Sequence, residues 1–276
     1  MQRIDILEPE FFRLIEKRYE TRNTFTIELA PLEERTLDFM PGQFNMLYAF
    51  GVGEVPVSIS SNSSRTHSYG HTVKIVGNVT KALDRIAVGD LVGVRGPFGS
   101  SWPVDECKGR DVIVIAGGIG LAPMRPLIYS LLDNRKEFGN VALLYGAREP
   151  EEIVFADELR EWNQAFDDQV YLTVDYANEK WSGNVGVVTR LLSRIPFSLE
   201  KSVAVLCGPE IMLRFAVNEL KNRHVDDRDI YLAMERNMKC AIGHCGRCQY
   251  VSNFICKDGS ILSYEKVKPF FAKKEI

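Results

Sequence analysis

The chain has 276 residues, of which 45% are hydrophobic and 26% charged, and its formal net charge is −3. This is the composition of a soluble globular protein with about two domains. It argues against a nucleic-acid binder, which would carry a clustered basic excess, and against membrane insertion, which needs a long apolar stretch. The N-terminal MQRIDILEPEFF lacks the pattern of a signal peptide, so we expect a cytoplasmic protein.

Residues 1–104 have the pattern of short β-strands, among them NTFTIELA, GQFNMLYAF, PVSISS, HTVKIVG and LVGVRGPFG. Gly, Pro, Asn and Ser separate these runs, and many short strands at close spacing predict a small antiparallel β-barrel. Ser58 places a hydroxyl in the middle of a predicted strand, where an apolar residue would pack better. In GNVTKAL, Thr80 is predicted to be the N-cap of a short helix. The free N–H groups of such a helix start form a phosphate site.

Residues 105–226 alternate apolar strands with helical stretches. The run DVIVIAG is continuously apolar, which is typical of a strand buried on both faces of a parallel sheet. NVALLYGA, VYLTVDYA and SVAVLCG follow, separated by amphipathic segments. This order predicts a doubly wound α/β domain.

A glycine-rich turn follows the first of these strands, with Gly117, Gly118 and Gly120 in VIVIAGGIGLAP. Glycines at this position let the backbone approach a pyrophosphate, whose charge the helix N-terminus favours. The alternative is a tight turn without a ligand, because the full G-x-G-x-x-G fingerprint is absent and no P-loop lysine follows.

A second candidate site lies where Cys207 ends a buried strand and Gly208 and Pro209 begin the next helix. Ligands of an α/β sheet bind beyond the carboxyl ends of its strands, so Cys207 is expected to face the same crevice as the glycine turn. The alternative is a buried cysteine that acts as a small hydrophobic residue.

Residues 227–276 hold one more strand, a cysteine loop and a short tail. The loop has the spacing Cys240-x4-Cys245-x2-Cys248-x7-Cys256, and its first three cysteines match the plant-type [2Fe–2S] pattern. Structural zinc is the alternative, although zinc ribbons favour two C-x2-C pairs and this loop has one. Disulfides fit a cytoplasmic protein less well. Since four cysteines fill the ligand set, His244 is interpreted as a loop residue. Cys107, in a polar interdomain stretch, is interpreted as incidental.

The ordered motifs PGQF, P-x-S, G-x-V-T-x-A-L, GPFG, GGIG-x-AP, YGAR and CGP-x-x-M resemble those of the ferredoxin–NADP reductase superfamily, over roughly residues 30–215. The resemblance implies an FAD-binding barrel in residues 1–104, an NAD(P)-binding α/β domain in residues 105–226 and, with the cysteine loop, a [2Fe–2S] domain in residues 227–276.

The same resemblance implies roles for individual residues. Ser58 would lie near the flavin N5 edge, and Pro56 and Val57 are candidate cofactor-binding residues beside it. Cys207 would lie near the nicotinamide, and Ser58 and Cys207 are the candidate catalytic residues. The residues implied to hold the FAD pyrophosphate are Gly77, Val79 and Thr80. Those implied to line the dinucleotide site are Gly117, Gly118 and Gly120, and Gly208 and Pro209 are implied to lie with Cys207 near the nicotinamide. Those implied to bind the cluster are Cys240, Cys245, Cys248 and Cys256.

One motif departs from the superfamily. Its usual flavin signature is Arg-x-Tyr-Ser, and this chain has Val55-Pro56-Val57-Ser58. A P-[IV]-S sequence is typical of electron-transfer subunits in multi-subunit enzymes. With the tail LAMERNMKCAIGHCGRCQ included, the chain resembles the gamma (diaphorase) subunits of soluble nickel–iron hydrogenases and sulfhydrogenases. It is also similar to the B subunit of anaerobic sulfite reductase and, more distantly, to the electron-transfer subunit of dihydroorotate dehydrogenase.

The three predicted sites form a chemical series. Nicotinamide exchanges two electrons as a hydride, an iron–sulfur cluster exchanges one, and a flavin converts between them. The sequence therefore predicts electron transfer between NAD(P)H, FAD, a [2Fe–2S] cluster and a partner. Because the chain has no further set of catalytic ligands, its expected partners are the catalytic and iron–sulfur subunits of a redox complex.

Several alternatives stay open at this point. The partner is predicted to be a hydrogenase or sulfhydrogenase, with sulfite reductase, dihydroorotate dehydrogenase or an oxygenase as alternatives; a zinc-stabilised nucleotide-binding regulator is the alternative of another class. Arg148 could meet the 2′-phosphate of NADPH, whereas Asp175 could favour the free ribose of NADH. The tail KVKPFFAKK could dock on a partner, or be a solvated end with Phe270 and Phe271 buried.

Overall fold

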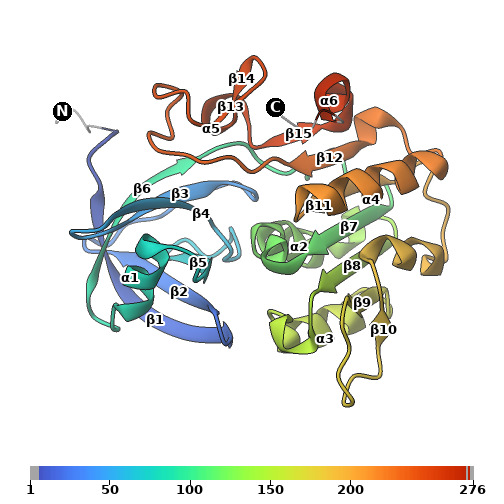
Figure 1. Cartoon of the computed structure of the whole chain (residues 1–276), viewed down its shortest axis with the longest axis horizontal. Helices are drawn as coiled ribbons and strands as arrows, with labels where there is room; N and C mark the ends of the chain where they lie inside the picture. The colour runs from blue at the N-terminus through green and yellow to red at the C-terminus, as the bar shows by residue number, and fades with distance from the viewer. Residues whose placement is uncertain (1–5, 272, 274–276) are drawn as a thin grey trace.

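The computed structural model describes residues 6–271 and residue 273. Its strands form a six-stranded sheet, a seven-stranded sheet and a two-stranded ribbon. Figure 1 shows the six-stranded sheet, built from the N-terminal part, beside the seven-stranded sheet, with the ribbon above β6 and β3. The candidate cofactor sites lie where these parts meet.

The six-stranded sheet is antiparallel, with the order β4-β3-β6-β1-β2-β5. An isolated bridge between Ile59, just after β4, and His71 of β5 joins its two edges, so the sheet closes on itself as expected of a barrel. Alternate side chains, such as Phe12 and Leu14 of β1, fill its interior. The elements are β1 (Glu10–Thr21), β2 (Thr24–Pro31), β3 (Phe44–Ala49), β4 (Gly53–Ser58), β5 (Tyr69–Lys74), α1 (Asn78–Arg85) and β6 (Leu91–Phe98).

The seven-stranded sheet has the order β10-β9-β8-β7-β11-β12-β15 and is parallel apart from β15. Its central strand β7 is buried along its whole length, as the continuous apolar run predicted. The strands are β7 (Val112–Gly117), β8 (Val141–Ala147), β9 (Val170–Val174), β10 (Asn184–Val185), β11 (Val203–Cys207), β12 (Ile230–Ala233) and β15 (Ile261–Ser263).

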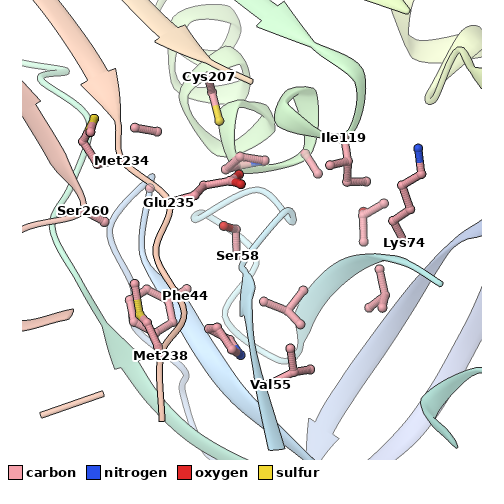
Figure 2. Close-up of a pocket in the computed structure, with 18 of the residues that line it drawn as sticks. Phe44, Val55, Ser58, Lys74, Ile119, Cys207, Met234, Glu235, Met238 and Ser260 are labelled. Carbon is pink, nitrogen blue, oxygen red and sulfur yellow. The ribbon is translucent and has the colours of Figure 1, made fainter. Parts of the chain in front are cut away.

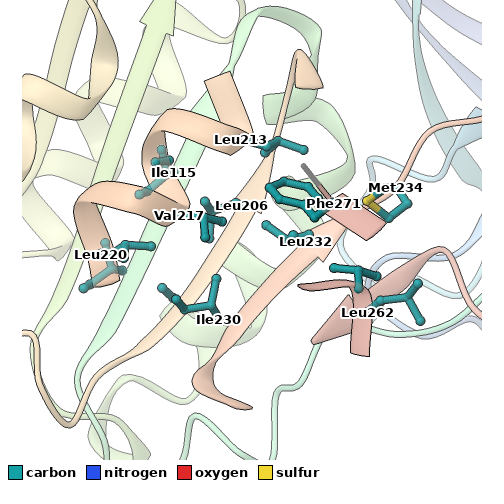
Figure 3. Packing of buried hydrophobic residues seen from close by; sticks show 14 of the residues in the cluster. Ile115, Leu206, Leu213, Val217, Leu220, Ile230, Leu232, Met234, Leu262 and Phe271 are labelled. Atoms are coloured by element: carbon teal, nitrogen blue, oxygen red, sulfur yellow. The ribbon is translucent and has the colours of Figure 1, made fainter. Parts of the chain in front are cut away.

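Helices cover both faces of this sheet, which confirms the doubly wound α/β prediction. One face packs against α2 (Arg125–Asp133) and α3 (Ala156–Ala165). The other packs against α4 (Glu210–Asn222), and Figure 3 shows Leu213, Val217 and Leu220 of α4 against the sheet. Short 3-10 helices complete the layers: η1 (Gly118–Met124), η2 (Arg135–Glu137), η3 (Pro150–Glu152), η4 (Val188–Arg194) and η5 (Asp227–Asp229).

The segment 227–276 contributes both to the sheet and to a separate loop. β12 and β15 extend the seven-stranded sheet. Between them lie the ribbon β13 (Gln249–Tyr250) and β14 (Asn253–Phe254), and α5 (Ile255–Asp258). The sheet therefore continues past residue 226, and the division of the chain at residues 104 and 226 stays a prediction.

The C-terminal tail forms α6 (Tyr264–Phe271). Figure 3 shows Phe271 among the buried side chains of the sheet, and Phe270 packs at the edge of the same cluster. This packing favours a solvated end with two buried rings. Ala272 and Lys274 lie outside the described residues.

Three sequence interpretations are wrong in detail. Gly77, not Thr80, is the N-cap of α1, and Thr80 is the third residue of the helix. Ser58 is the last residue of β4, not a mid-strand residue. Cys107 lies in the buried core beneath β7 rather than in a polar stretch, because the turn that carries it folds back onto the sheet.

Candidate functional site

A cavity of about 330 Å³ lies between the barrel and the seven-stranded sheet. The barrel contributes Phe44 and the end of β4, including the predicted residues Pro56, Val57 and Ser58. The sheet contributes Cys207, and the segment after β12 contributes Glu235 and Met238. Figure 2 shows the side chains of Ser58, Glu235 and Cys207 directed into this space. The cavity thus brings together the two residues that the sequence nominated as catalytic.

A buried histidine, His71, contacts the backbone of Ser58. The Nδ1 atom of His71 lies 3.0 Å from the backbone oxygen of Ser58, and its Nε2 lies 3.2 Å from Nδ2 of Asn45. Because the carbonyl only accepts and the amide donates, Nδ1 carries the proton and the ring is neutral. Burial lowers the pKa of His71 to about 4, which keeps it neutral at physiological pH.

Cys207 presents a neutral thiol to the cavity. Its side chain is buried at the end of β11, and this burial, with the nearby carboxylate of Glu235, raises its pKa well above the ordinary value. A protonated thiol is a poor nucleophile and a small, polarisable wall residue. The protonated thiol of Cys207 is therefore suited to packing against the ring of a bound ligand rather than to covalent catalysis.

A second cavity, of about 430 Å³, lies beyond the carboxyl ends of β7, β8 and β9. The glycine turn, Gly208 and Pro209 form its floor, and Arg148 and Asp175 stand at the ends of their strands. The predicted residues that line it are Gly117, Gly118, Gly120, Gly208 and Pro209. This is the position where open α/β sheets bind ligands.

The two cavities adjoin each other. Lys74, Ile119 and Glu235 line both of them. The ammonium of Lys74 lies 3.4 Å from the carboxylate of Glu152, which is also in the second cavity. A ligand in one cavity would therefore lie next to a ligand in the other.

The start of α1 borders the first cavity. Val76 and Thr80 line it, whereas Gly77 and Val79 are not among its lining residues. The Thr80 hydroxyl accepts hydrogen bonds from the backbone N–H groups of Val76 at 3.0 Å and Gly77 at 2.9 Å. A Cβ on Gly77 would meet nothing within 4 Å, so open space faces this backbone. Open space therefore borders the N-terminus of α1, where backbone N–H groups of the helix favour an anion.

The four clustered cysteines lie in one loop between β12 and β15. Cys248 and Cys256 are buried, with their sulfur atoms 3.2 Å apart, while Cys245 is exposed. Backbone N–H groups point at the sulfurs: Gly243 donates to Cys256 at 3.1 Å. His244 and Cys245 each donate to the sulfur of Cys240 at 3.3 Å.

Left-handed residues shape this loop around the sulfurs. Gly243 and Gly246 have φ of 72° and 73°, a region that favours glycine, and Ala241 shares it at 62°. Hydrogen bonds to the sulfurs help set the potential of an iron–sulfur site, and these turns supply N–H donors for such bonds. The donor set therefore fits a [2Fe–2S] cluster. Among residues 6–271 and 273, no group of three or more His, Cys, Asp and Glu side chains is arranged to hold a metal ion.

The thiols of Cys240 and Cys256, at the two ends of the loop, have different pKa values. Burial opposes ionisation of Cys240, but the backbone N–H groups of Ile242, Cys245 and His244 outweigh it and lower its pKa to about 6. At Cys256, burial and the hydrogen bond with the Cys248 thiol raise the pKa to about 12. A metal that binds the sulfur of Cys256 must therefore displace the thiol proton.

Sequence reasoning missed several charged residues that line the cavities, among them Glu235 and Lys74. Glu235 follows the end of β12, so the rule that ligands bind at the carboxyl ends of strands could have found it. Enclosure by the cavity walls raises the pKa of its carboxyl group. Lys74 ends β5, and no motif in the sequence marks it.

The helices that the structure describes include none long and apolar enough to cross a membrane.

Comparison with known proteins agrees with this arrangement. Residues 114–218 match the family described as the oxidoreductase NAD-binding domain. Among solved structures, an NADH-dependent reduced ferredoxin–NADP oxidoreductase has a TM-score of 0.74 at 22% identity, covering 92% of this chain and 88% of that one. This likeness shows that the two chains share a fold.

Two curated relatives are similar over most of their length. The sulfhydrogenase 2 gamma subunit of Pyrococcus furiosus is 33% identical, over 91% of this chain and 93% of the relative. A probable electron transfer subunit of dihydroorotate dehydrogenase B (NAD(+)) from Pyrococcus abyssi is 35% identical, over 85% and 83%. The chain therefore belongs to the family of sulfhydrogenase gamma subunits and dihydroorotate dehydrogenase electron transfer subunits.

Proposed function

We propose that the chain transfers electrons between NAD(P)H and a partner subunit through FAD and a [2Fe–2S] cluster. The observation that carries this proposal is the joining of the two cavities at Lys74, Ile119 and Glu235, together with a cysteine loop that begins directly after Met238 of the first cavity. When bound, a flavin exchanges a hydride with nicotinamide and single electrons with an iron–sulfur cluster.

The first cavity is proposed to hold the isoalloxazine ring of FAD. Pro56 and Val57 supply apolar contact along β4, and Ser58 supplies a hydroxyl at the end of that strand. Gly77, Val79 and Thr80 at the start of α1 are proposed to receive the pyrophosphate, because N–H groups at a helix N-terminus favour anions.

The second cavity is proposed to bind NAD(P)H. Its glycine turn lets the backbone approach the pyrophosphate, and Gly208 and Pro209, which line it, directly follow Cys207 of the first cavity. Ser58 and Cys207 are proposed to fix where the nicotinamide meets the flavin, and proximity of this kind is a main source of rate enhancement. No side chain needs to move a proton in this arrangement.

The cysteine loop is proposed to bind the cluster through Cys240, Cys245, Cys248 and Cys256. Three backbone N–H groups already point at two of these sulfurs, and such donors tune cluster potentials. Cys245 is exposed, which gives the cluster an edge toward a partner. A zinc-stabilised regulator remains the alternative of another class, and membership of an electron-transfer family favours the redox function.

The partner is proposed to be the catalytic part of a multi-subunit redox complex, first of all a hydrogenase or sulfhydrogenase. The similarity to a sulfhydrogenase gamma subunit over 93% of that relative supports this choice. A dihydroorotate dehydrogenase is the second candidate, supported by the similarity to its electron transfer subunit; an anaerobic sulfite reductase is a third. Purification of the native complex and identification of the stoichiometric partner decide between them.

The relay itself is tested on protein purified without air. Flavin and iron are quantified, and Cys248→Ser is compared with Cys107→Ser, a matched loss of one buried thiol outside the loop. Cys248→Ser should lose electron delivery to the partner while flavin reduction by NAD(P)H continues, and Cys107→Ser should behave as the wild type. Equal loss of both activities in Cys248→Ser, or a colourless zinc-loaded wild type, contradicts the proposal.

A further inference from the structure

One buried arginine joins the barrel to the cysteine loop. Arg95 lies on β6 with only 3% of its side chain exposed. Its Nε and Nη2 atoms donate to both carboxylate oxygens of Glu54, at 3.0 and 2.7 Å. Its other contacts are with backbone carbonyls: Ile6 at 3.1 Å, Cys240 at 3.2 Å and Lys239 at 3.5 Å. All five N–H donors of the guanidinium therefore have an acceptor.

The carbonyls of Lys239 and Cys240 belong to the segment that connects the first cavity to the cysteine loop. Met238 lines the first cavity, and Cys240 is the first of the four loop cysteines. Lys239 alone separates them, so residues 238–240 form the shortest covalent path between the cavity and the loop. Arg95 binds the carbonyls of both residues that follow Met238.

Glu54, the carboxylate partner of Arg95, also adjoins the first cavity. Glu54 lies on β4 directly before Val55, and residues 55–58 of that strand line the cavity. The bidentate pair fixes the guanidinium in one orientation, because the planar fork of arginine matches a carboxylate. The strand that forms the cavity wall and the segment that begins the loop are thus held by the same side chain.

We infer that Arg95 is a positioning residue for electron transfer between the two proposed cofactors, an inference that rests on the proposed function. The guanidinium fixes residues 239 and 240 against the barrel and so sets the separation and orientation of the cavity and the loop. Electron tunnelling slows steeply with distance, so a loop that moves away from the barrel transfers electrons more slowly. Glu54 holds the guanidinium and neutralises its buried charge.

The test compares Arg95→Lys with a matched control. Lysine keeps the charge but cannot span a carboxylate and two carbonyls with a planar fork. Arg110→Lys is the control, because Arg110 makes the same kind of contacts far from the loop: both oxygens of Asp229, at 2.8 and 2.7 Å, and the carbonyl of Lys201, at 3.0 and 2.9 Å. A second variant, Glu54→Gln, keeps the arginine and weakens its anchor.

Two measurements are made. In anaerobic stopped flow, flavin reduction by NAD(P)H in Arg95→Lys should stay within about twofold of wild type, while cluster reduction should slow by at least about tenfold. In cluster-free, flavin-loaded protein, hydrogen exchange of the amides in residues 238–248 should speed up by at least about tenfold. Glu54→Gln should also slow cluster reduction and speed up amide exchange in residues 238–248, but by smaller factors. Arg110→Lys should leave both rates unchanged.

The outcomes separate the inference from the proposed function. If Arg95→Lys and Glu54→Gln match Arg110→Lys in cluster reduction and in exchange of the loop, Arg95 does not position the loop. If Arg95→Lys does not fold, Glu54→Gln decides alone by the same criteria. If wild type holds flavin but no cluster, the proposed function fails; the exchange measurement still shows whether Arg95 holds the loop.

Discussion

Gly120 packs directly against the backbone of Cys207. A Cβ on Gly120 would stand 2.6 Å from the Cys207 carbonyl oxygen and 2.9 Å from the nitrogen of Gly208. These are backbone atoms at the carboxyl end of β11, so they cannot turn aside as a flexible side chain could. The glycine turn and the end of β11 therefore form one rigid floor under the second cavity.

This packing predicts the effect of Gly120→Ala. The added methyl group should push η1 away from β11, destabilise the fold by about 1–3 kcal/mol and raise the KM for NAD(P)H at least about tenfold. Gly118→Ala is the comparison, because its Cβ meets nothing within 4 Å and only its φ of 55° is unfavourable. Steady-state kinetics and chemical denaturation measure both effects. Equal KM values for the two variants would contradict a role for the close approach at Gly120.

Buried His71 predicts a loss of stability in acid. Its folded pKa is about 4 and its unfolded pKa about 6.5, so the unfolded chain binds a proton at a pH where the folded chain does not. Stability is therefore full above pH 6.5 and falls as the pH drops from 6.5 toward 4, by up to about 3 kcal/mol. Urea denaturation at pH 7 and pH 5 measures the change. His71→Gln should remove this component, and replacement of the exposed His67 by Gln should retain it.

We expect the carboxylate of Glu235 to speed hydride transfer from NAD(P)H to the flavin. The nicotinamide ring gains positive charge as it loses a hydride, and a carboxylate at the junction of the two cavities favours that charge. Glu235→Gln should slow flavin reduction at saturating NAD(P)H about tenfold, which corresponds to about 1.4 kcal/mol, with flavin content unchanged. Glu265→Gln, the same change at an exposed position of α6, is the control. Stopped-flow absorbance of the flavin is the measurement, and an unchanged limiting rate would remove Glu235 from this role.

Arg148 and Asp175 predict opposite shifts in cosubstrate preference. Both line the second cavity at the ends of neighbouring strands. A carboxylate repels a 2′-phosphate and accepts from a ribose hydroxyl, whereas a guanidinium attracts the phosphate. Asp175→Ala should raise the ratio of kcat/KM for NADPH to that for NADH at least about tenfold, and Arg148→Ala should lower it. A ratio that moves the same way in both variants would mean that the ribose lies elsewhere.

The different exposure of three of the cysteines predicts a pattern of thiol labelling. In cluster-free protein, iodoacetamide should modify exposed Cys245, while Cys107 and Cys207 stay unmodified until the chain unfolds. Burial raises the pKa of Cys107 to about 12 and that of Cys207 well above its ordinary value, so neither forms a thiolate. Peptide mass spectrometry reads the sites, and cluster-loaded protein should protect Cys245. Labelling of Cys107 or Cys207 as fast as Cys245 would contradict the burial on which this prediction rests.

Features that depend only on neighbouring residues could be predicted from the amino-acid sequence. The spacing from Cys240 to Cys256, the glycine turn after β7 and the apolar run of β7 each encode one piece of backbone geometry, so their patterns could be interpreted directly. The alternation of strand and helix likewise predicted the doubly wound sheet. One local error, Thr80 as N-cap, arose because a threonine at a predicted helix start is expected at the N-cap. In the structure Thr80 is the third residue of the helix, and its hydroxyl accepts from the backbone N–H groups of Val76 and Gly77, which precede the helix.

The tertiary structure alone decided which distant residues meet. Ser58, Cys207 and Glu235 share a cavity only because the barrel closes against the carboxyl ends of β11 and β12. Arg95 reaches Cys240 across 145 positions of sequence, and Cys107 became a core residue when its turn folded onto the sheet. Contacts of this kind depend on how whole layers pack, and short-range periodicity carries no information about the packing of layers.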